Sequence, residues 1–275
     1  MQYLKESLRY IFVQGKGKHL LLLLLFGIVP SVLFGYALPA EKILLNVISP
    51  PEYSWWGELW LSHTIGYRGL INSGIAILLL FVTTACMCSI IVKHFRIGTF
   101  GMPSVLTASN DYFFPCLIYT LSNAIAYLFA YTLYTVFAYM WYIYFSQVAY
   151  AILCCISLVA IGFALFYYVS SIVLWLPTMT IKGLRGKTAF TTAIYQTRGK
   201  QKKLLPGKFF IVLLLTACTL ISYFFSKIWY ISWIINTVFY AFAYVYSIVH
   251  IIIVYFGENY LPREDLARSP YKRRY

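Results

Sequence analysis

Six long apolar runs dominate the pattern of hydrophobic and polar positions along the 275 residues. Each run is long enough to cross a bilayer as a helix, because about 20 apolar residues span the roughly 30 Å of hydrocarbon. We therefore predict an all-α polytopic membrane protein whose residues 1–275 form a single transmembrane domain. The predicted transmembrane helices cover residues 19–40, 69–92, 113–137, 147–175, 209–226 and 228–256.

The composition supports lipid as the solvent of this chain. Apolar residues make up 61% of it and charged residues 11%, whereas soluble domains average about 45–50% and about 25%. A water-soluble fold of this size has too little interior to bury that much apolar surface. The composition therefore excludes a soluble domain.

The basic residues lie almost entirely on one side of the predicted topology. The chain has 22 Lys and Arg against 8 Asp and Glu. An N-terminal segment (1–18), the loop after the second helix, the 178–208 loop and the tail (257–275) hold all of these basic residues except Lys42, Arg68 and Lys227. Because basic residues mark cytoplasmic loops, we predict a multi-pass protein of the cell membrane with both termini in the cytoplasm. Residues 41–68 then form an outer loop, and the charge needs no nucleic-acid partner.

A short segment with an apolar face precedes each helix that is predicted to run outward. These segments cover residues 3–12, 100–106 and 188–195. The run Gly15 to Leu21 also aligns without a gap with Gly199 to Leu205, and both place Gly and Lys before a span. We predict three transmembrane hairpins, each preceded by a cytoplasmic interfacial helix. The alternative is that any basic loop ends in this way before a span.

Basic residues in these segments are the candidates for contact with anionic lipid headgroups or with an acidic partner. Each basic residue near the membrane surface contributes about 1 kcal/mol of attraction to anionic lipids. The candidates are Lys16, Lys18, Lys187, Arg198, Lys200, Lys202 and Lys203.

The segment from Lys187 through Gly199 and Lys200 to Leu205 resembles the cytoplasmic loop of the YciC-type six-helix bacterial membrane proteins. It is also similar to the related membrane domain of some glycerophosphodiester phosphodiesterases. The stretch from Tyr10 to Tyr36, with Gly27 and Pro30, has a similar pattern. About 60 of the 275 residues carry the resemblance, which implies a bacterial envelope protein. No catalytic motif lies in these residues, so the phosphodiesterase activity is not carried over.

Ionisable side chains within a bilayer usually mark proton or ion paths, and the predicted helices hold few of them. Residues 113–175 contain none, and the acid Glu41 is predicted at the outer end of the first helix. The absence of paired carboxylates argues against proton-coupled transport. The candidate intramembrane polar sites are Asn123, Asn236 and His250, which serve either in hydrogen bonds between helices or in a polar groove.

The six cysteines lack the spacing of a zinc site, and no His lies beside them in register. The chain shows no nucleophile elbow, no zinc-protease helix and no phosphate loop. We therefore expect no catalytic residue, no metal and no cofactor. The tyrosines that recur between residues 119 and 150 are read as helix packing and interface anchors.

These patterns favour a non-enzymatic integral membrane protein. It would act as an envelope scaffold or as an accessory subunit of a membrane complex. The alternative is the permease subunit of an ATP-driven transporter with a separate ATPase chain. The 178–208 loop would then supply the coupling helix. A membrane enzyme that acts on lipids is the least favoured reading.

Overall fold

The computed structural model describes residues 2–14, 18–63, 66–98 and 103–264 and contains only helices within these ranges. The prediction of an all-α fold is confirmed. The helices are α1 (Gln2–Arg9), the π-helix η1 (Tyr10–Gln14), α2 (Lys18–Ala37), α3 (Glu41–Ile48), α4 (Trp56–Ser62), α5 (Gly66–Ile97), α6 (Pro103–Tyr144), α7 (Gln147–Ser171), α8 (Trp175–Lys182), α9 (Gly186–Thr197), α10 (Gln201–Phe224) and α11 (Trp229–Glu258).

Six helical segments are long and apolar enough to cross a membrane, as the sequence predicts. The chain is therefore a multi-pass membrane protein. The segments are Leu24–Ile48, Arg68–Ile97, Ser109–Tyr144, Gln147–Lys182, Lys203–Phe224 and Trp229–Glu258.

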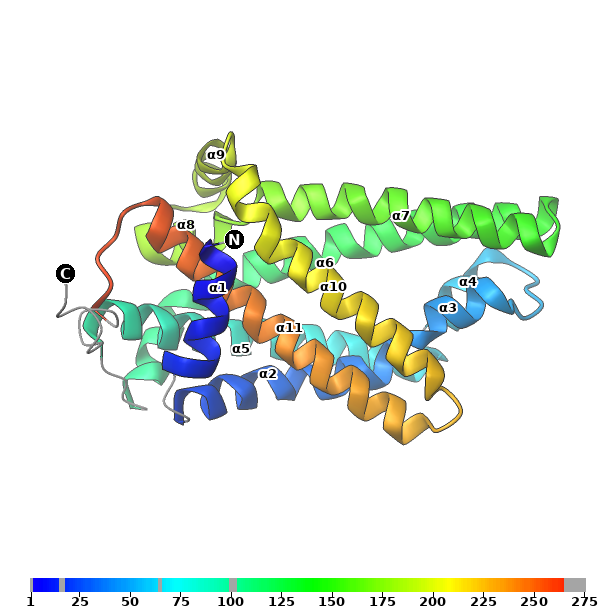
Figure 1. Cartoon of the computed structure of the whole chain (residues 1–275), viewed down its shortest axis with the longest axis horizontal. Coiled ribbons are helices and arrows are strands. Elements are labelled where there is room, and N and C mark those ends of the chain that lie inside the picture. Colours follow the sequence, from blue (N-terminus) through cyan, green and yellow to red (C-terminus); the bar gives the residue numbers. More distant parts are fainter. Residues whose placement is uncertain (1, 15–17, 64–65, 99–102, 265–275) are drawn as a thin grey trace.

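The bundle has two chemically different ends (Figure 1). Helices α1, α8 and α9 lie at one end, together with the start of α10 and the end of α11, and we call it the basic end. Helices α3 and α4 lie at the opposite end, beside the turns that join α6 to α7 and α10 to α11. We call this the aromatic end. The described chain begins with α1 and ends after α11 at the basic end, and its six long helical segments run between the two ends.

Two of the expected interfacial segments are separate short helices. Helix α1 with η1 precedes α2, and α9 precedes α10. Gly199, which follows α9, adopts a φ of 80°, a left-handed conformation that glycine takes without strain and that commonly ends a helix. The segment before the third span differs, because α6 runs without a break from Pro103 to Tyr144. Residues 100–102 of the expected segment lie outside the described residues.

The larger core lies at the basic end, where α5 and α11 are central. Residues such as Met87, Ile91 and Phe95 of α5 are completely buried, and the Phe95 ring meets Phe256 of α11 edge to face at 5.1 Å. Helix α2 packs closely on α11 through Gly27 and Gly35, where an added Cβ would collide with α11. Small residues allow such close approach between helices in a membrane.

A second, smaller core holds the aromatic end together. Tyrosines of the α6–α7 hairpin donate hydrogen bonds to backbone carbonyls of the segment that carries α3 and α4. Tyr131 reaches Trp60 at 2.5 Å, and Tyr150 reaches Asn46 at 3.2 Å. The predicted outer loop 41–68 is therefore largely helical and packed. The aromatic residues 139–144 form the last part of α6, because no Gly, Pro or charge interrupts the helix there.

Candidate functional site

Two clusters of buried polar side chains lie inside the bundle. The carboxylate cluster joins Glu41 of α3 to α10 and α11. Glu41 accepts hydrogen bonds from the Ser232 hydroxyl and, at 3.0 Å, from the Asn236 amide. The Asn236 carbonyl oxygen accepts from Ser222 at 2.8 Å and from the Cys218 thiol at 3.2 Å. In the part of the chain that is described, none of the buried polar atoms of this cluster lacks a partner.

The position of Glu41 corrects the expectation from the sequence. The structure places Glu41 inside the first membrane-spanning segment, where the residue is only 8% exposed. The reason is that α3 begins soon after α2 and packs against α10, so that Glu41 meets Ser232 and Asn236 of α11. A buried carboxylate therefore lies within a candidate span, although it is paired with uncharged donors from its neighbours.

The histidine cluster lies at the basic end, where His250 of α11 meets Ser7 of α1. The Ser7 hydroxyl lies 3.0 Å from His250 Nδ1 and donates to the Tyr3 carbonyl at 2.7 Å. Because a hydroxyl has one proton, Nδ1–H must donate to Ser7, which leaves Nε2 as the unprotonated nitrogen. Nε2 is buried and has no partner among the described residues. The Tyr246 ring stacks on the imidazole with 5.5 Å between centroids.

Gly207 of α10 forms the wall of the histidine cluster. A side chain at this position would overlap the His250 imidazole. The next residue, Lys208, is 6% exposed, and its Nζ donates to the Val169 carbonyl of α7 at 3.3 Å. No carboxylate lies within ion-pair distance of Lys208 in the described part of the chain. An ammonium buried with a single neutral acceptor is costly in a membrane interior.

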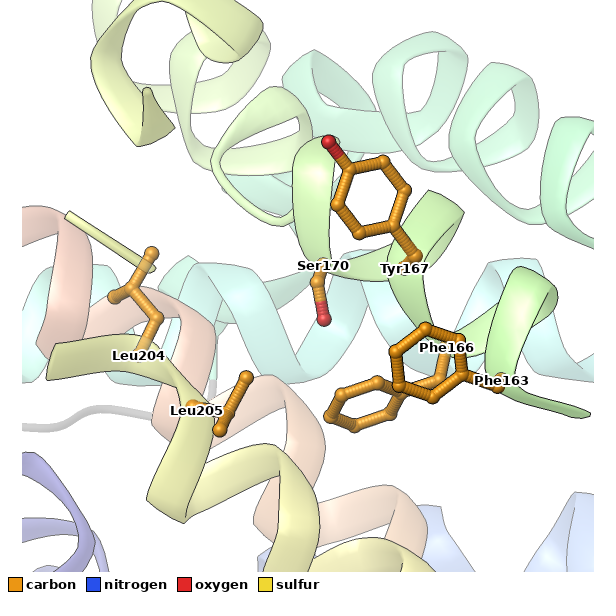
Figure 2. Close-up of a pocket in the computed structure, with 6 residues that line it drawn as sticks. All are labelled: Phe163, Phe166, Tyr167, Ser170, Leu204 and Leu205. Carbon is orange, nitrogen blue, oxygen red and sulfur yellow. The ribbon is translucent and has the colours of Figure 1, made fainter. Parts of the chain in front are cut away.

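An apolar slot of about 230 Å³ opens between α7 and α10. Figure 2 shows its lining residues, and the Ser170 hydroxyl points toward the space between Phe166 and Leu205. Ser170 is 7% exposed, and its hydroxyl has no partner among the described residues. The lining residues are Phe163, Phe166, Tyr167, Ser170, Leu204 and Leu205.

Glu258 of α11 links α1 and the start of α10 to α11 at the basic end. Its carboxylate accepts a hydrogen bond from Tyr3 of α1 at 2.8 Å and lies 2.8 Å from Lys200 Nζ and 3.9 Å from Lys203 Nζ. Burial and the hydrogen bond to Glu258 raise the pKa of Tyr3. Two of the lysines expected to contact lipid therefore also neutralise a buried acid, although Lys203 stays largely exposed.

The other predicted candidates fall in different surroundings. Lys187 and Arg198 are exposed at the two ends of α9. Lys16 lies outside the described residues. Lys18 and Lys202 lie in the first turns of α2 and α10, but their side chains are not among those described.

The three predicted intramembrane polar residues differ in whether they link helices. Asn123 donates to Tyr119 of its own helix at 2.7 Å, so this bond does not link two helices. Asn236 and His250 both join helices, each at the centre of one cluster. Sequence reasoning missed Glu41, Ser7, Ser170 and Lys208 as parts of these clusters. Only Lys208 carried a signal, because it follows Leu204 by one helical turn inside an apolar run.

No group of three or more His, Cys, Asp or Glu side chains within the described residues is arranged to hold a metal ion. No family model, no curated protein and no solved structure matches this chain. Its function is therefore argued from the residues and their geometry.

Proposed function

We propose that this chain is a non-enzymatic integral membrane protein of the bacterial cell membrane, with both termini in the cytoplasm. It acts as a scaffold or accessory subunit and binds a transmembrane helix of a partner protein. The observation that carries the proposal is the unequal burial of its six spans. The most apolar stretch of the α5 span is 61% buried, and the same holds for α11, whereas the values for α6 and α7 are 11% and 17%.

The α6–α7 hairpin packs against α5 through α6 and is fixed by specific side-chain contacts near both of its ends. The tyrosine bonds described above fix one end, and Tyr119 meets Trp175 of α8 at 6.2 Å near the other. Leu121, Ile125 and Phe129 recur every four residues along the exposed side of α6. The span is also long, since 36 residues reach about 54 Å against roughly 30 Å of hydrocarbon. A rigid, aromatic-rich helix surface of this kind suits a partner helix.

The geometry of Ser7 and His250 favours a non-enzymatic role. A nucleophile needs its proton available to a base and room for substrate beside it. The Ser7 hydroxyl instead donates to a backbone carbonyl. Ser7 and His250 are 0% and 2% exposed, and Gly207 lies against the imidazole. The pair is therefore sealed from any substrate.

The test is a tagged pull-down of the full chain from native membranes in a mild detergent, with quantitative mass spectrometry. We expect one membrane protein in near-stoichiometric amount. The variant Ile125→Ala/Phe129→Ala removes exposed side chains from α6 and should lower its recovery about tenfold, because the two side chains lie in the contact. The matched control Leu220→Ala/Phe224→Ala makes the same change on the exposed side of α10. Equal recovery from both variants, or lipid turnover by the purified chain alone, would contradict the proposal.

A second candidate is the permease subunit of an ATP-driven transporter, and α9 favours it. Helix α9 connects the fourth and fifth spans at the basic end and buries Ala189, Ala193 and Thr197 against the bundle. Its other side exposes Tyr195, which is 79% accessible. A permease needs such a helix outside the bilayer to contact its ATPase. On this reading Tyr195→Ala releases a co-purified ATPase, whereas the α6 variant does not.

A further inference from the structure

Within the described residues the Ser170 hydroxyl, like that of Thr237, lacks the hydrogen bond that many Ser and Thr hydroxyls of the membrane-spanning helices make. Ser and Thr in such helices commonly donate to the carbonyl four residues earlier. Ser171 does so to Tyr167 at 2.9 Å, and Thr216 does so to Val212 at 2.9 Å. Ser170 has no such bond among the described residues and points into the slot instead. It is therefore a free donor at a buried position.

Lys208 does not line the slot, but it bonds to the backbone next to Ser170. Its Nζ contacts the carbonyl of Val169, the residue that precedes Ser170. An ammonium has three N–H donors, so two remain after this bond. Lys208 does not extend to the surface as basic side chains at helix ends usually do, because it is only 6% exposed. The two unused N–H donors of Lys208 therefore suit an anion that binds next to Ser170.

Lys208 lies between the basic start of α10 and its apolar part. It follows Lys203 by about 7.5 Å along the helix axis, which is close to the roughly 5–7 Å thickness of one headgroup layer. With the Lys203 ammonium at the outer surface of the headgroups, an anion at Lys208 lies near their inner boundary.

The slot itself suits a hydrocarbon chain. Five of its six lining residues are aromatic or aliphatic, and only Ser170 is polar apart from the Tyr167 hydroxyl. Its 230 Å³ far exceeds the roughly 10–15 Å³ that one water needs. Phe163, Tyr167 and Leu205 are 69%, 57% and 48% exposed, so the slot opens toward the surrounding lipid.

We propose that the slot between α7 and α10 binds one anionic phospholipid. An acyl chain lies among Phe163, Phe166 and Leu205, and the phosphate takes hydrogen bonds from Lys208 and Ser170. The lipid would supply the acceptors that these two donors lack within the chain. The inference is independent of the proposed function, because a scaffold and a permease could equally hold a lipid at this place.

The test is native mass spectrometry of the full chain in detergent with added phosphatidylglycerol or phosphatidylcholine. We expect one phosphatidylglycerol to bind, with phosphatidylcholine at least about tenfold weaker, because the zwitterion leaves Lys208 without a net countercharge. Inorganic phosphate is the third probe. Equal binding of the two lipids would overturn the proposal. Occupation of Lys208 by inorganic phosphate as tightly as by phosphatidylglycerol would show a phosphate site and overturn the lipid assignment.

Matched variants separate the site from general basic attraction. Lys208→Met keeps the length of the side chain without its charge and should lower phosphatidylglycerol binding about tenfold or more. Lys182→Met, an exposed lysine at the end of α8, should lower it by less than about twofold. Ser170→Ala should weaken binding, whereas its neighbour Ser171→Ala should not. Unchanged binding by both Lys208→Met and Ser170→Ala would overturn the proposal.

A third pair tests the slot without touching the donors, so it remains informative if Lys208→Met does not fold. Leu205→Trp fills the slot from an exposed position, and Leu220→Trp adds the same bulk on an exposed position further along α10. We expect Leu205→Trp alone to displace the lipid. Retention of phosphatidylglycerol by Leu205→Trp would overturn the placement of the acyl chain.

Discussion

The carboxylate cluster and the polar groups of the basic end both lie buried between helices. They differ in how many of their polar atoms have a hydrogen-bond partner. Asn236 uses both amide hydrogens and receives two donors at its carbonyl oxygen, so that Glu41 is enclosed by partners. At the basic end, His250 Nε2 and the Ser170 hydroxyl have no partner among the described residues. Lys208 there has only a backbone carbonyl.

This difference separates the buried polar groups that stabilise the fold from those that are free to bind a ligand. A closed network stabilises the fold, and its members are expensive to remove singly. An incompletely paired group near an opening is tolerated where something outside the chain completes it. The carboxylate cluster is therefore a structural joint between α3, α10 and α11. The unpaired donors beside the slot form a binding site.

The largest expected effect breaks the closed cluster. Asn236→Leu removes one of the two hydrogen-bond donors of the Glu41 carboxyl group and the acceptor of the Ser222 hydroxyl. We expect the free energy of unfolding to fall by about 3 kcal/mol, because two buried polar groups each lose a hydrogen-bond partner. Denaturant unfolding in detergent, followed by circular dichroism, measures it. A loss below about 1 kcal/mol would show that the cluster is not a structural joint.

The second prediction uses His63, a buried histidine that directly follows α4 at the aromatic end. It lies between Tyr131 and Tyr134, and Nδ1 lies 2.9 Å from the Leu59 carbonyl. Burial lowers the pKa of His63 to about 4, below the usual value of about 6.5. The unfolded chain therefore takes up the proton first as the pH falls. The stability from neutral His63 is complete above about pH 6.5 and is lost toward pH 4.

Between pH 7 and pH 5 this loss amounts to about 2 kcal/mol. Unfolding titrations at the two pH values measure it, with His63→Gln as the comparison. The variant should lose most of the acid sensitivity. If wild type and variant respond equally to acid, His63 is not the group that titrates.

The third prediction concerns the wall of the histidine cluster. Gly207→Ala forces a methyl group against the imidazole of His250, which Ser7 and Tyr246 hold in place. We expect a loss of about 2 kcal/mol from overpacking. Gly162→Ala on α7 is the control, because an added Cβ there meets nothing within 4 Å. The same cost for both variants would mean that the ring is free to move aside.

The smallest effect compares two serines directly. Ser222→Ala removes a bond within the carboxylate cluster and should cost about 1 kcal/mol. Ser170→Ala removes a hydroxyl that has no partner within the described chain and should change stability by less than about 0.5 kcal/mol in lipid-free detergent. If Ser170→Ala lowers the free energy of unfolding more than Ser222→Ala does, the Ser170 hydroxyl stabilises the fold and the contrast with the carboxylate cluster is wrong.

The sequence predicts the number of spans and the helix-rich connections, because apolar length and basic loops carry those signals. It placed the ends of the spans less well. The first span extends to Ile48, and α6 extends to Tyr144. Local pattern does not distinguish an interfacial aromatic run from a helix that packs against a distant segment.

Some residues of the candidate sites could be predicted from the sequence, and others could not. Asn236 and His250 were found because a polar residue in an apolar run is visible in the sequence. Glu41 and Lys208 were assigned to the ends of loops. Their burial depends on how α3 and α10 pack against other helices, which the local sequence does not show. Ser7 and Ser170 are ordinary in sequence and acquire meaning only from the partners that they have or lack. The resemblance to the YciC-type proteins stays a prediction.

The most direct test of the contrast is the stability of Lys208→Met with and without phosphatidylglycerol. In lipid-free detergent the variant removes a buried charge that has no countercharge, so we expect it to be more stable than wild type by about 1 kcal/mol. With phosphatidylglycerol present, wild type gains stability from the bound lipid and the variant does not, so the order reverses. A variant that is less stable than wild type by the same amount in both conditions would show that Lys208 is an ordinary part of the fold, and would contradict the account.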